Sequence, residues 1–430
     1  MVQANDTSYD TIIIGGGPAG TSSAATLAMH GHKVLVLERE KFPRYHIGES
    51  LLPFTCYPLK RIGMFEKMRK SAFVKKHSVQ FVSPSGKASI PFYFSTRYEE
   101  DVAQTWQVLR SEFDQMLMDN AREKGATAKE EITVRELLRD GERVVGVRAV
   151  DKSGTVTDYR APITMDCSGR ESFSASRNDW RIKDPQLNKI ACWTYYKGAK
   201  RDPGIDEGAT TVAYVPEKGW FWYIPQHDNM ISVGVVAEGA YLMRDNVREP
   251  KDIFNREVEQ NLWIKDHLAV GQQTGPYRIT GEYSFRSKYC ATEGLVLVGD
   301  AYGFLDPVFS SGVMLALKSG VMSADVVHSC LVAKDFSAQR FTEYGQMMIQ
   351  GIENMRSLVY AFYDLDFSFR KLGNKYPALL GPVTDCLSGD VNKSFEELYT
   401  ACREFAKMPE PLPYGLPKMP ECAPGSACCS

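Results

Sequence analysis

Six residues near the start of the chain have the spacing of a phosphate-binding turn. Residues 15–20 read GGGPAG and fit the pattern G-x-G-x-x-G, directly after the β-branched run 11–14. In such a turn Gly15 allows a sharp bend, Gly17 lets the backbone approach a pyrophosphate, and Gly20 lets a helix pack closely on a strand. The N-terminus of that helix offers free N–H groups and a positive dipole end to the phosphates. The turn therefore predicts a dinucleotide site.

Glu38 provides a carboxylate where such a site needs one. It ends the next expected strand, residues 33–37, about 20 residues after the turn, where a carboxylate accepts hydrogen bonds from ribose hydroxyls. The two strands and the helix between them make a βαβ unit. By itself this unit would serve FAD or NAD equally well.

A pair of tryptophans and a pair of lysines are further candidates for chemistry. Residues 220–225 read WFWYIP, and in a strand Trp220 and Trp222 share one face, which is then large, rigid and apolar. Two interpretations of this pair stay open, a packed core and the wall of a binding site. Lys75 and Lys76 begin a strand-like run, where they are either solvated charges or a source of a desolvated, reactive amine.

Composition limits what can surround these residues. The chain has 430 residues, 43% of them hydrophobic, which is enough for a sizeable core and two or three domains. Its net charge of -2 gives no general attraction to nucleic acid or to an anionic membrane. The longest apolar runs have the length of strands, and the first lacks the basic residues and cleavage site of a secretory signal. We expect a cytoplasmic protein with no membrane span and no nucleic-acid partner.

The order of the expected elements predicts interleaved domains. The βαβ unit and the segment GLVLVGD (294–300) both contain buried strands of the parallel type, while residues 186–288 are strand-rich and aromatic. We therefore predict an α/β fold in which a discontinuous Rossmann-type domain carries an antiparallel (α+β) insertion, with ligands where the two meet. The predicted boundaries are 1–75, 105–180 and 290–350 for the nucleotide domain, 76–104 and 181–289 for the substrate-domain sheet, 351–412 for a helical C-terminal region, and 413–430 for an irregular tail.

The predicted tail contains three of the ten cysteines, Cys422, Cys428 and Cys429, among Pro, Gly and Ser residues. These cysteines could bind a metal or pair with one another. We expect instead a frayed and reduced tail, and no metal site in the chain, because the cysteines are scattered without CxxC pairs.

Gly299 and Asp300 decide between the two dinucleotides. An Asp at a strand end that enters a glycine-containing loop and then a helix resembles the second fingerprint of the class A flavoprotein monooxygenases, whose Asp contacts the ribityl chain of FAD. Residues 108–114 match the family pattern V-x-R-x-x-F-D, whose Arg (Arg110) lies near the flavin, and residues 166–170 are a looser counterpart of an Asp-Gly fingerprint. The resemblance implies FAD, bound by a domain of the p-hydroxybenzoate hydroxylase type.

The string 220–225 narrows the resemblance, because W-x-W-x-I-P is the signature of the flavin-dependent halogenases. Residues 48–53 resemble the family's G-E-x-x-x-P loop near the flavin ring, and residues 304–312 resemble its F-x-x-P-x-x-S-x-G segment. Residues 73–81 resemble F-x-x-K-x-G-x-x-F, which carries the essential halogenase lysine. The match selects Lys76, although a serine replaces the usual glycine.

The resemblance assigns roles to individual residues. It implies that Lys76, Trp220 and Trp222 are catalytic and that Ser311 and Gly312 lie at a halide site. The implied contacts with FAD come from Gly15, Gly17, Ala19, Gly20, Glu38, Arg39, Glu49, Ser50, Arg110, Asp300, Pro307, Gly312 and Val313.

The chemistry of the family comes with these roles. Reduced FAD, oxygen and chloride or bromide give hypohalous acid, which moves through the protein to the lysine. The lysine either forms a haloamine or hydrogen-bonds the acid, and an electron-rich aromatic ring is substituted. Because only one dinucleotide fingerprint is present, we expect a separate NAD(P)H-dependent flavin reductase. In length the chain resembles the smaller members of the family, which act on phenol or pyrrole rings. In these members the ring is often attached to an acyl or peptidyl carrier protein.

Other functions stay open at this point. A flavin-dependent monooxygenase (hydroxylase) and a geranylgeranyl-type reductase of isoprenoid double bonds share the scaffold. A non-catalytic flavin-binding redox sensor is a candidate of another class. The W-x-W-x-I-P string and Lys76 argue against these alternatives. His77, His227 and Glu282 are candidate bases by position alone, and we expect each to be a surface group.

Overall fold

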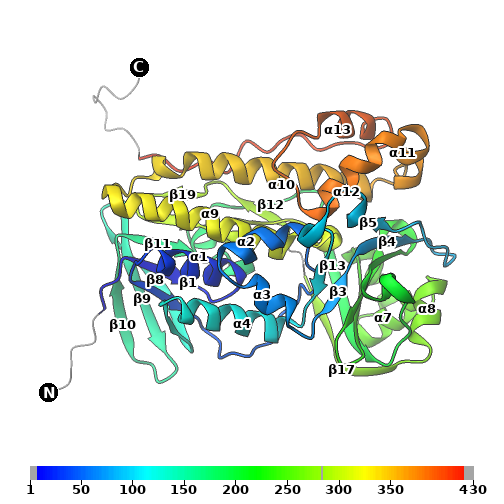
Figure 1. Cartoon of the computed structure of the whole chain (residues 1–430), viewed down its shortest axis with the longest axis horizontal. Helices are drawn as coiled ribbons and strands as arrows, with labels where there is room; N and C mark the ends of the chain where they lie inside the picture. The colour runs from blue at the N-terminus through cyan, green and yellow to red at the C-terminus, as the bar shows by residue number, and fades with distance from the viewer. Residues whose placement is uncertain (1–6, 282–283, 421–430) are drawn as a thin grey trace.

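The structure, a computed structural model, describes residues 7–281 and 284–420. A parallel sheet with its helices forms one end of the molecule and a large antiparallel sheet forms the other (Figure 1). The long helices α9 (Ser311–Ala333) and α10 (Thr342–Tyr363) run side by side along the parallel-sheet end and continue towards the antiparallel one (Figure 1). This arrangement confirms the predicted fold class.

The parallel sheet consists of short strands rich in β-branched residues. Its strand order is β19-β20-β11-β1-β2-β7, and all neighbours are parallel except β19 and β20. Every residue of β1 and β2 is buried, because both faces of the sheet are covered. The strands are β1 (Thr11–Ile14), β2 (Val34–Leu37), β7 (Thr127–Lys129), β11 (Ile163–Asp166), β19 (Ala291–Thr292) and β20 (Leu295–Leu297).

Alternate side chains of β1 and β2 pack against different layers, as the two-residue period of a strand requires. Ile13 and Val36 belong to the core that includes residues of helices α1, α4 and α9. Ile12 and Leu35 pack on a second sheet, which is antiparallel with the order β10-β9-β8. The new elements are α1 (Pro18–Met29), α4 (Arg110–Glu123), β8 (Ile132–Asp140), β9 (Arg143–Asp151) and β10 (Val156–Arg160).

Helix α9 crosses α1 at close range. A Cβ on Gly320 of α9 would lie 2.1 Å from Ser22 Oγ and 2.7 Å from the carbonyl oxygen of Ala19, so glycine is needed for this approach. The Ser23 hydroxyl donates to the carbonyl of Gly320 at 3.1 Å. Within the described residues α9 alone is long and apolar enough to cross a membrane, but half of its apolar window is buried inside the protein. Its apolar character is that of a core helix.

The large antiparallel sheet has seven strands in the order β17-β13-β16-β15-β14-β4-β5. Its neighbours are antiparallel except β14 and β4, which are parallel. The strands are β4 (Ser78–Val82), β5 (Phe92–Tyr93), β13 (Lys189–Lys197), β14 (Thr210–Tyr214), β15 (Trp220–Gln226), β16 (Met230–Glu238) and β17 (Gln272–Thr280).

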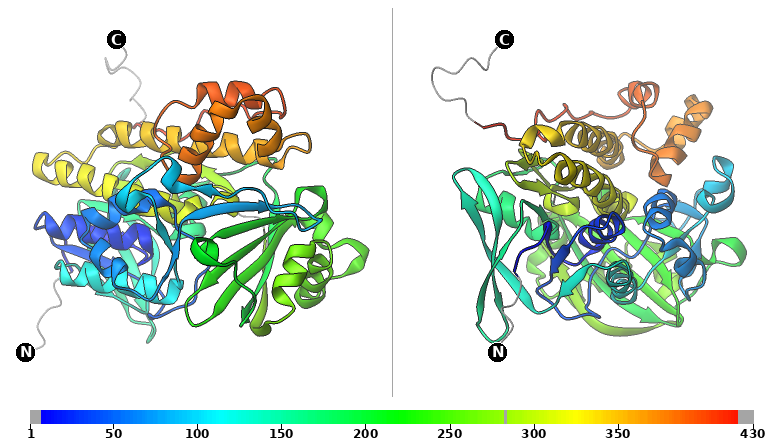
Figure 2. Two further views of the ribbon diagram at one scale, coloured as in Figure 1. Left: turned by 45° about the vertical axis from the view of Figure 1, so that its right-hand side comes forward. Right: turned by 60° about the vertical axis from the view of Figure 1, so that its left-hand side comes forward.

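The two faces of this sheet have separate cores. Phe221 and Tyr223 of β15 pack with residues of α6 (Gly239–Leu242), α7 (Pro250–Val258) and α8 (Leu262–Leu268) on the outer face. In the left view of Figure 2, these green helices cover the side of the sheet that faces away from the rest of the molecule. Trp220 and Trp222 belong to the core that the other face shares with the parallel-sheet end.

Short elements connect and cover these parts. Strands β3 and β6 form a separate antiparallel pair, and β12, β18 and β21 form another small sheet. Helices α11 to α13 lie at the upper right of Figure 1, near β4 and β5. Their bounds are α2 (Cys56–Arg61), α3 (Phe65–Arg69), β3 (Val74–Lys76), β6 (Thr105–Gln107), α5 (Phe173–Arg177), β12 (Arg181–Lys183), β18 (Phe285–Ser287), β21 (Gly303–Phe304), α11 (Phe369–Lys375), α12 (Leu380–Ser388) and α13 (Glu396–Cys402).

The first part of the predicted tail packs on the protein. The amide of Gly415 donates to the carbonyl of Lys288 and the amide of Lys418 to that of Ala291, both at 2.8 Å. The three cysteines of the tail, Cys422, Cys428 and Cys429, lie outside the described residues.

Candidate active site

An elongated cavity runs between the two ends of the molecule, from the N-terminus of α1 to the inner face of β15. Gly17 and Ala19 line one end, and Trp220 and Trp222 line the other. Of the residues that the resemblance assigns to FAD, all line this cavity except Gly20. The fold therefore brings together residues that are spread over some 300 positions in the sequence.

The three glycines of the turn differ in what surrounds them. Gly15 has a φ of +99°, and a Cβ there would lie 2.5 Å from the carbonyl oxygen of Cys167. A Cβ on Gly20 would lie 2.0 Å from the carbonyl oxygen of Gly15, so both glycines are needed for the fold itself. At Gly17 a Cβ would meet only Arg44 Nη2, at 3.7 Å. The open space at Gly17 and the length of the cavity fit the pyrophosphate and the extended shape of FAD.

Glu38 is held at the edge of the cavity beside this turn. Its Oε2 accepts from the amide of Gly16 at 2.7 Å, and its Oε1 accepts from the amide of Glu40 at 2.8 Å. Arg39 also lines the cavity and forms an ion pair with Glu171. The carboxylate of Glu38 is thus fixed by backbone donors before any ligand arrives.

Arg110 fixes the loop that carries Glu49 and Ser50. Its Nε and Nη2 donate to the carboxylate of Asp114 at 2.8 and 2.9 Å, and its Nη1 donates to the carbonyls of Ile47 and Gly48 at 2.7 and 3.2 Å. The Arg and Asp of the V-x-R-x-x-F-D pattern are therefore a bidentate pair that anchors a neighbouring loop. Arg110 acts here through the shape of the cavity wall.

The N-terminus of α9 lies at the cavity wall. Ser310, with a left-handed φ of 57°, turns the chain into the helix, and Gly312 and Val313 line the cavity. Ser311 is buried and does not line it, whereas its neighbour Ser310 does. The first N–H groups of a 23-residue helix and its positive dipole end suit an anion.

Asp300 lines the cavity after β20, and burial raises its pKa to about 6 against the opposing charges of Arg170 and Arg110. Pro307 follows on the same wall, in a turn capped by Asp306, whose side chain accepts from the amide of Val308 at 2.9 Å. Both residues belong to the segment that joins β20 to α9.

Three tryptophans form the far wall. Trp193 of β13 joins Trp220 and Trp222, with ring centroids 6.2 Å apart for Trp193–Trp222 and 6.3 Å for Trp220–Trp222. Sequence reasoning missed Trp193, although its alternation with Tyr195 along β13 is the same signal that singled out β15.

Each of these indole N–H groups is fixed by a hydroxyl. Trp220 donates to Tyr363 at 2.8 Å, Trp222 to Ser232 at 3.1 Å, and Trp193 to Tyr45 at 2.7 Å. A buried indole with its N–H satisfied has one preferred orientation, so the wall is rigid.

Lys76 lies behind the cavity wall with no exposed surface. Its ammonium donates to Ser50 Oγ at 2.9 Å and to the carbonyl of Leu51 at 3.1 Å, and it lies 5.6 Å from the ring centre of Phe94. Burial lowers the pKa of Lys76 to about 7. Lys75 points the other way and is exposed. Of the two lysines, only Lys76 is therefore buried, and its lowered pKa increases the fraction of neutral amine near neutral pH.

Sequence reasoning also missed the partners of Glu49. Its Oε1 accepts from the hydroxyl of Tyr195 at 2.8 Å. The hydroxyl oxygens of Tyr195 and Tyr45 lie 3.1 Å apart, and because Tyr195 has only one O–H hydrogen, Tyr45 is the donor in this second contact. Burial raises the pKa of Glu49. No motif marks the two tyrosines, because they come from a loop and from a strand some 150 residues apart.

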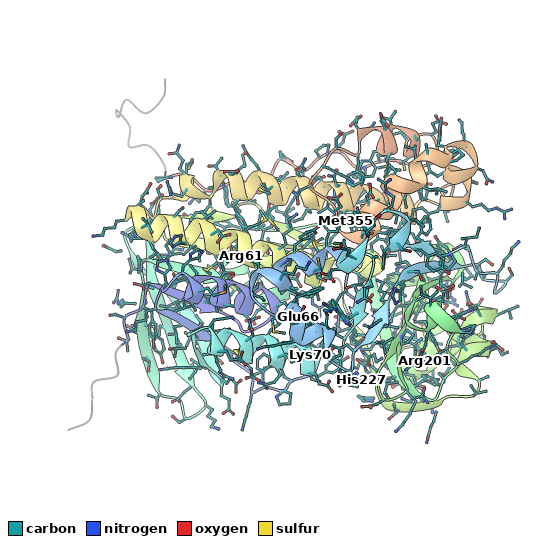
Figure 3. The ribbon with its side chains drawn as sticks, viewed as in Figure 1. Arg61, Glu66, Lys70, Arg201, His227 and Met355 are labelled. Carbon is teal, nitrogen blue, oxygen red and sulfur yellow. The ribbon has the colours of Figure 1, made fainter. Side chains whose placement is uncertain are left out.

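The three positional candidates for a base lie away from the cavity or outside the described residues. His227 follows β15 on the side away from α10 (Figure 3), and its Nε2 lies 3.1 Å from Glu112. His77 is half-buried, and burial lowers its pKa. Neither lines the cavity. Glu282 lies outside the described residues.

Comparison with protein-family models identifies a family. The model described as tryptophan halogenase matches residues 10–96 and 84–370. Among curated proteins, the chain is 32% identical over 411 residues to the 1H-pyrrole-2-carbonyl-[peptidyl-carrier protein] chlorinase of Pseudomonas fluorescens, covering 90% of each chain. It is 32% identical over 363 residues to the tryptophan 2-halogenase of Chondromyces crocatus, covering 83% of this chain and 68% of the relative.

Solved structures give the same picture. The chain aligns with a flavin-dependent brominase at a TM-score of 0.83 and 29% identity, covering 93% of this chain and 97% of the brominase. The similarity therefore includes both sheets and the C-terminal helices, and is not limited to the nucleotide-binding turn.

Proposed function

The chain belongs to the tryptophan halogenase family, and from this premise we propose that it halogenates an electron-rich aromatic ring, with a pyrrole carried on a carrier protein as the favoured substrate. It is an FAD-dependent enzyme that uses chloride or bromide. Two relatives support the choice of substrate: the chlorinase above, and a brominase of Pseudoalteromonas luteoviolacea whose name includes the same carrier-bound pyrrole, at 30% identity over 333 residues.

The buried Lys76 behind the cavity is the observation that carries this proposal. Bound reduced FAD supplies the two electrons that let oxygen and a halide ion give hypohalous acid. The N–H groups at the start of α9, where Gly312 lines the cavity, suit the halide. The tryptophans keep an aromatic ring apart from the flavin, and the ammonium of Lys76 hydrogen-bonds the hypohalous acid, or the amine takes the halogen, before an aromatic C–H becomes C–X.

Halogenated products test this proposal directly. We expect a pyrrole-2-carbonyl thioester on a carrier protein, incubated with the enzyme, FAD, a flavin reductase, NADH, oxygen and bromide, to gain the mass and isotope pattern of bromine. Free pyrroles and phenols in the same assay identify whether the carrier is needed. A product that gains only the mass of oxygen, independent of halide, would support the hydroxylase instead.

We also propose that reduced FAD comes from a separate NAD(P)H-dependent reductase. The sequence has one dinucleotide fingerprint, and residues 15–20 account for it. Turnover with NADH should therefore require an added reductase, and FAD reduced photochemically should replace both. Rapid oxidation of NADH by the enzyme alone would contradict this.

A cytoplasmic location completes the proposal. Within the described residues, all seven cysteines are buried and free, which suits a reducing compartment. Fractionation of cells that express the full chain would test it, with enzyme in the membrane or secreted fraction as the contrary result.

A further inference from the structure

Lys76 is sealed from solvent, so its proton exchange needs an internal route. The side chain has an exposed fraction of 0%, and Phe94, which is also fully buried, lies over its ammonium. An amine that takes part in halogen transfer must alternate between protonated and neutral forms. The groups that contact the ammonium therefore decide how this happens.

One of its two hydrogen-bond partners can relay a proton and the other cannot. The carbonyl of Leu51, at 3.1 Å, has no hydrogen to pass on. The hydroxyl of Ser50, at 2.9 Å, has one, and its oxygen lies 2.8 Å from Thr210 Oγ1. Ser50 and Thr210 both line the cavity, whereas Lys76 does not. A continuous path of hydroxyls thus joins the lysine to the cavity.

Gln107 fixes the direction of this path. Its Nε2 lies 2.9 Å from both the carbonyl of Gly208 and Thr210 Oγ1. The carbonyl can only accept, so the atom facing it is the nitrogen, and Thr210 accepts from Gln107. An ammonium at Lys76 only donates, so Ser50 accepts from it and donates to Thr210. Thr210 has then used both lone pairs, and its own O–H remains to donate into the cavity.

A neutral amine at Lys76 reverses the same path. Ser50 then donates to the lysine nitrogen and accepts from Thr210, while Gln107 still donates to Thr210. Only hydrogens change place, and the heavy atoms keep their positions.

We propose that Ser50 and Thr210 form the proton path of Lys76, and that Thr210 is the positioning residue that sets the charge state of the lysine. This rests on the proposed function for its role in catalysis. When an N–H bond of the ammonium breaks, its proton passes to Ser50, the proton of Ser50 passes to Thr210, and that of Thr210 passes to a water molecule in the cavity. One proton leaves, no electrons are exchanged, and a neutral amine remains.

The ¹³Cε chemical shift of Lys76 measures its charge state without halogenation, because the shift changes when the amine gains a proton and no reagent has to reach the buried side chain. The enzyme with FAD bound is labelled with ¹³Cε-lysine and titrated by NMR, with the Lys76 signal assigned from its loss in Lys76→Met and the exposed Lys75 as the internal reference. In Thr210→Val, Ser50 loses the acceptor for its proton when Lys76 is charged, so the neutral form is favoured. We expect the midpoint for Lys76 to fall by about one pH unit, a roughly ten-fold change in proton affinity.

Two variants distinguish the loss of the Thr210 hydroxyl from a general disturbance of packing around β14. Thr210→Ser restores the hydroxyl and should restore the parental midpoint. Thr211 is the next residue of the same strand, is equally buried, lies outside the cavity lining and accepts from Gln80 at 2.8 Å. Thr211→Val should keep the parental midpoint, and Thr210→Ala replaces Thr210→Val if the latter does not fold.

An unchanged midpoint in the Thr210 variant, or an equal change in Thr211→Val, would overturn the proposal. In the halogenation assay, Thr210→Val should move the pH dependence of kcat in the same direction, and Thr211→Val should not. If the parent enzyme made no halogenated product while the titration midpoints of Lys76 behaved as expected, the proposed function would fail and the proton path would stand.

Discussion

Trp222 lies directly across from Gly234 in the antiparallel pair of β15 and β16. A Cβ on Gly234 would stand 2.5 Å from the indole ring of Trp222 and 2.4 Å from the Cβ of Trp193. The missing side chain therefore provides the space in which both rings lie against the cavity. The wall of tryptophans depends on a residue that has no side chain at all.

Gly234→Ala should disturb this wall. The added methyl cannot fit without moving Trp222 or Trp193, and overpacking of this kind costs about 1–3 kcal/mol. We expect a lower melting temperature and a changed tryptophan fluorescence spectrum, while FAD, held mainly at the other end of the cavity, is still bound. Gly239→Ala is the control, because a Cβ there would meet only Ile190, at 3.8 Å. Equal melting temperatures for the two variants would contradict this account.

Local sequence patterns predicted the parts of the site that are local in the chain. Spacing within one or two elements is enough to recognise the turn of residues 15–20, Glu38 and the alternation of Trp220 and Trp222. The structure contains the strands and the helix on which these patterns depend. Only the motif match selects Lys76 over Lys75 as the catalytic candidate, because the start of a strand does not indicate which of two neighbouring lysines is buried.

Contacts between distant segments could not be read in this way. Ser50 meets Thr210, 160 positions away, and Trp220 meets Tyr363, 143 positions away. Such pairs are fixed by where the loop at Ser50 lies relative to β14, and by where β15 lies relative to α10, which no pattern within a short window encodes. Ser310 lines the cavity and Ser311 does not. This difference likewise depends on the left-handed backbone conformation of one residue, Ser310.

Gly17→Val should abolish the retention of FAD and leave the fold intact. The backbone at Gly17 has a φ of -73°, which any residue adopts, and a Cβ there meets only Arg44. A valine side chain would instead occupy the space of the pyrophosphate. We expect a near-parental far-UV spectrum and melting temperature without FAD, together with loss of bound flavin on a desalting column. Gly20→Ala, which places a Cβ 2.0 Å from the carbonyl of Gly15, should instead lower stability.

Lys76→Met should uncouple oxygen consumption from halogenation. The binding residues of the cavity are untouched, so reduced FAD still reacts with oxygen, but the activated halogen has no amine at the substrate. We expect oxygen uptake within about two-fold of the parent and no halogenated product by mass spectrometry. Lys75→Ala is the matched control and should halogenate normally, because Lys75 is exposed. The reverse result would move the role to Lys75.

Burial of Lys76 should make stability depend on pH with a defined sign. Burial lowers its pKa to about 7 in the folded protein, against an ordinary lysine value of 10.5. Between these values the unfolded state binds one more proton, so the free energy of unfolding rises with pH by about 1.4 kcal/mol per unit. Well below pH 7 Lys76 is protonated in both the folded and the unfolded state. The free energy of unfolding then no longer changes with pH through this group, and it is lowered by the full cost of burying the charge.

Urea titrations at pH 7, 8 and 9, with saturating FAD, measure this dependence. The Lys76→Met variant lacks the group and should lack this contribution, so the stability difference between variant and parent should shrink as the pH rises. A difference that stays constant with pH would show that Lys76 keeps an ordinary pKa.

Trp222→Phe tests whether the tryptophans are a wall or only a packed core. Phenylalanine keeps most of the apolar packing but leaves Ser232 without its indole donor and opens space beside Trp193. If Trp222 is part of a wall, it limits how closely the substrate can approach the flavin. We expect a folded variant with near-parental FAD binding and oxygen consumption, and with a lower halogenation yield or a trace of hydroxylated product.

Phe221→Leu is the matched control for this variant. Phe221 is the neighbour of Trp222 on β15, is fully buried, and faces the outer core with α7 and α8, away from the cavity. Its truncation should lower the melting temperature by a comparable amount and leave the product pattern unchanged. If both variants lost halogenation only in proportion to their unfolded fraction, the tryptophans would be core residues, and the separation of ring from flavin would need another cause.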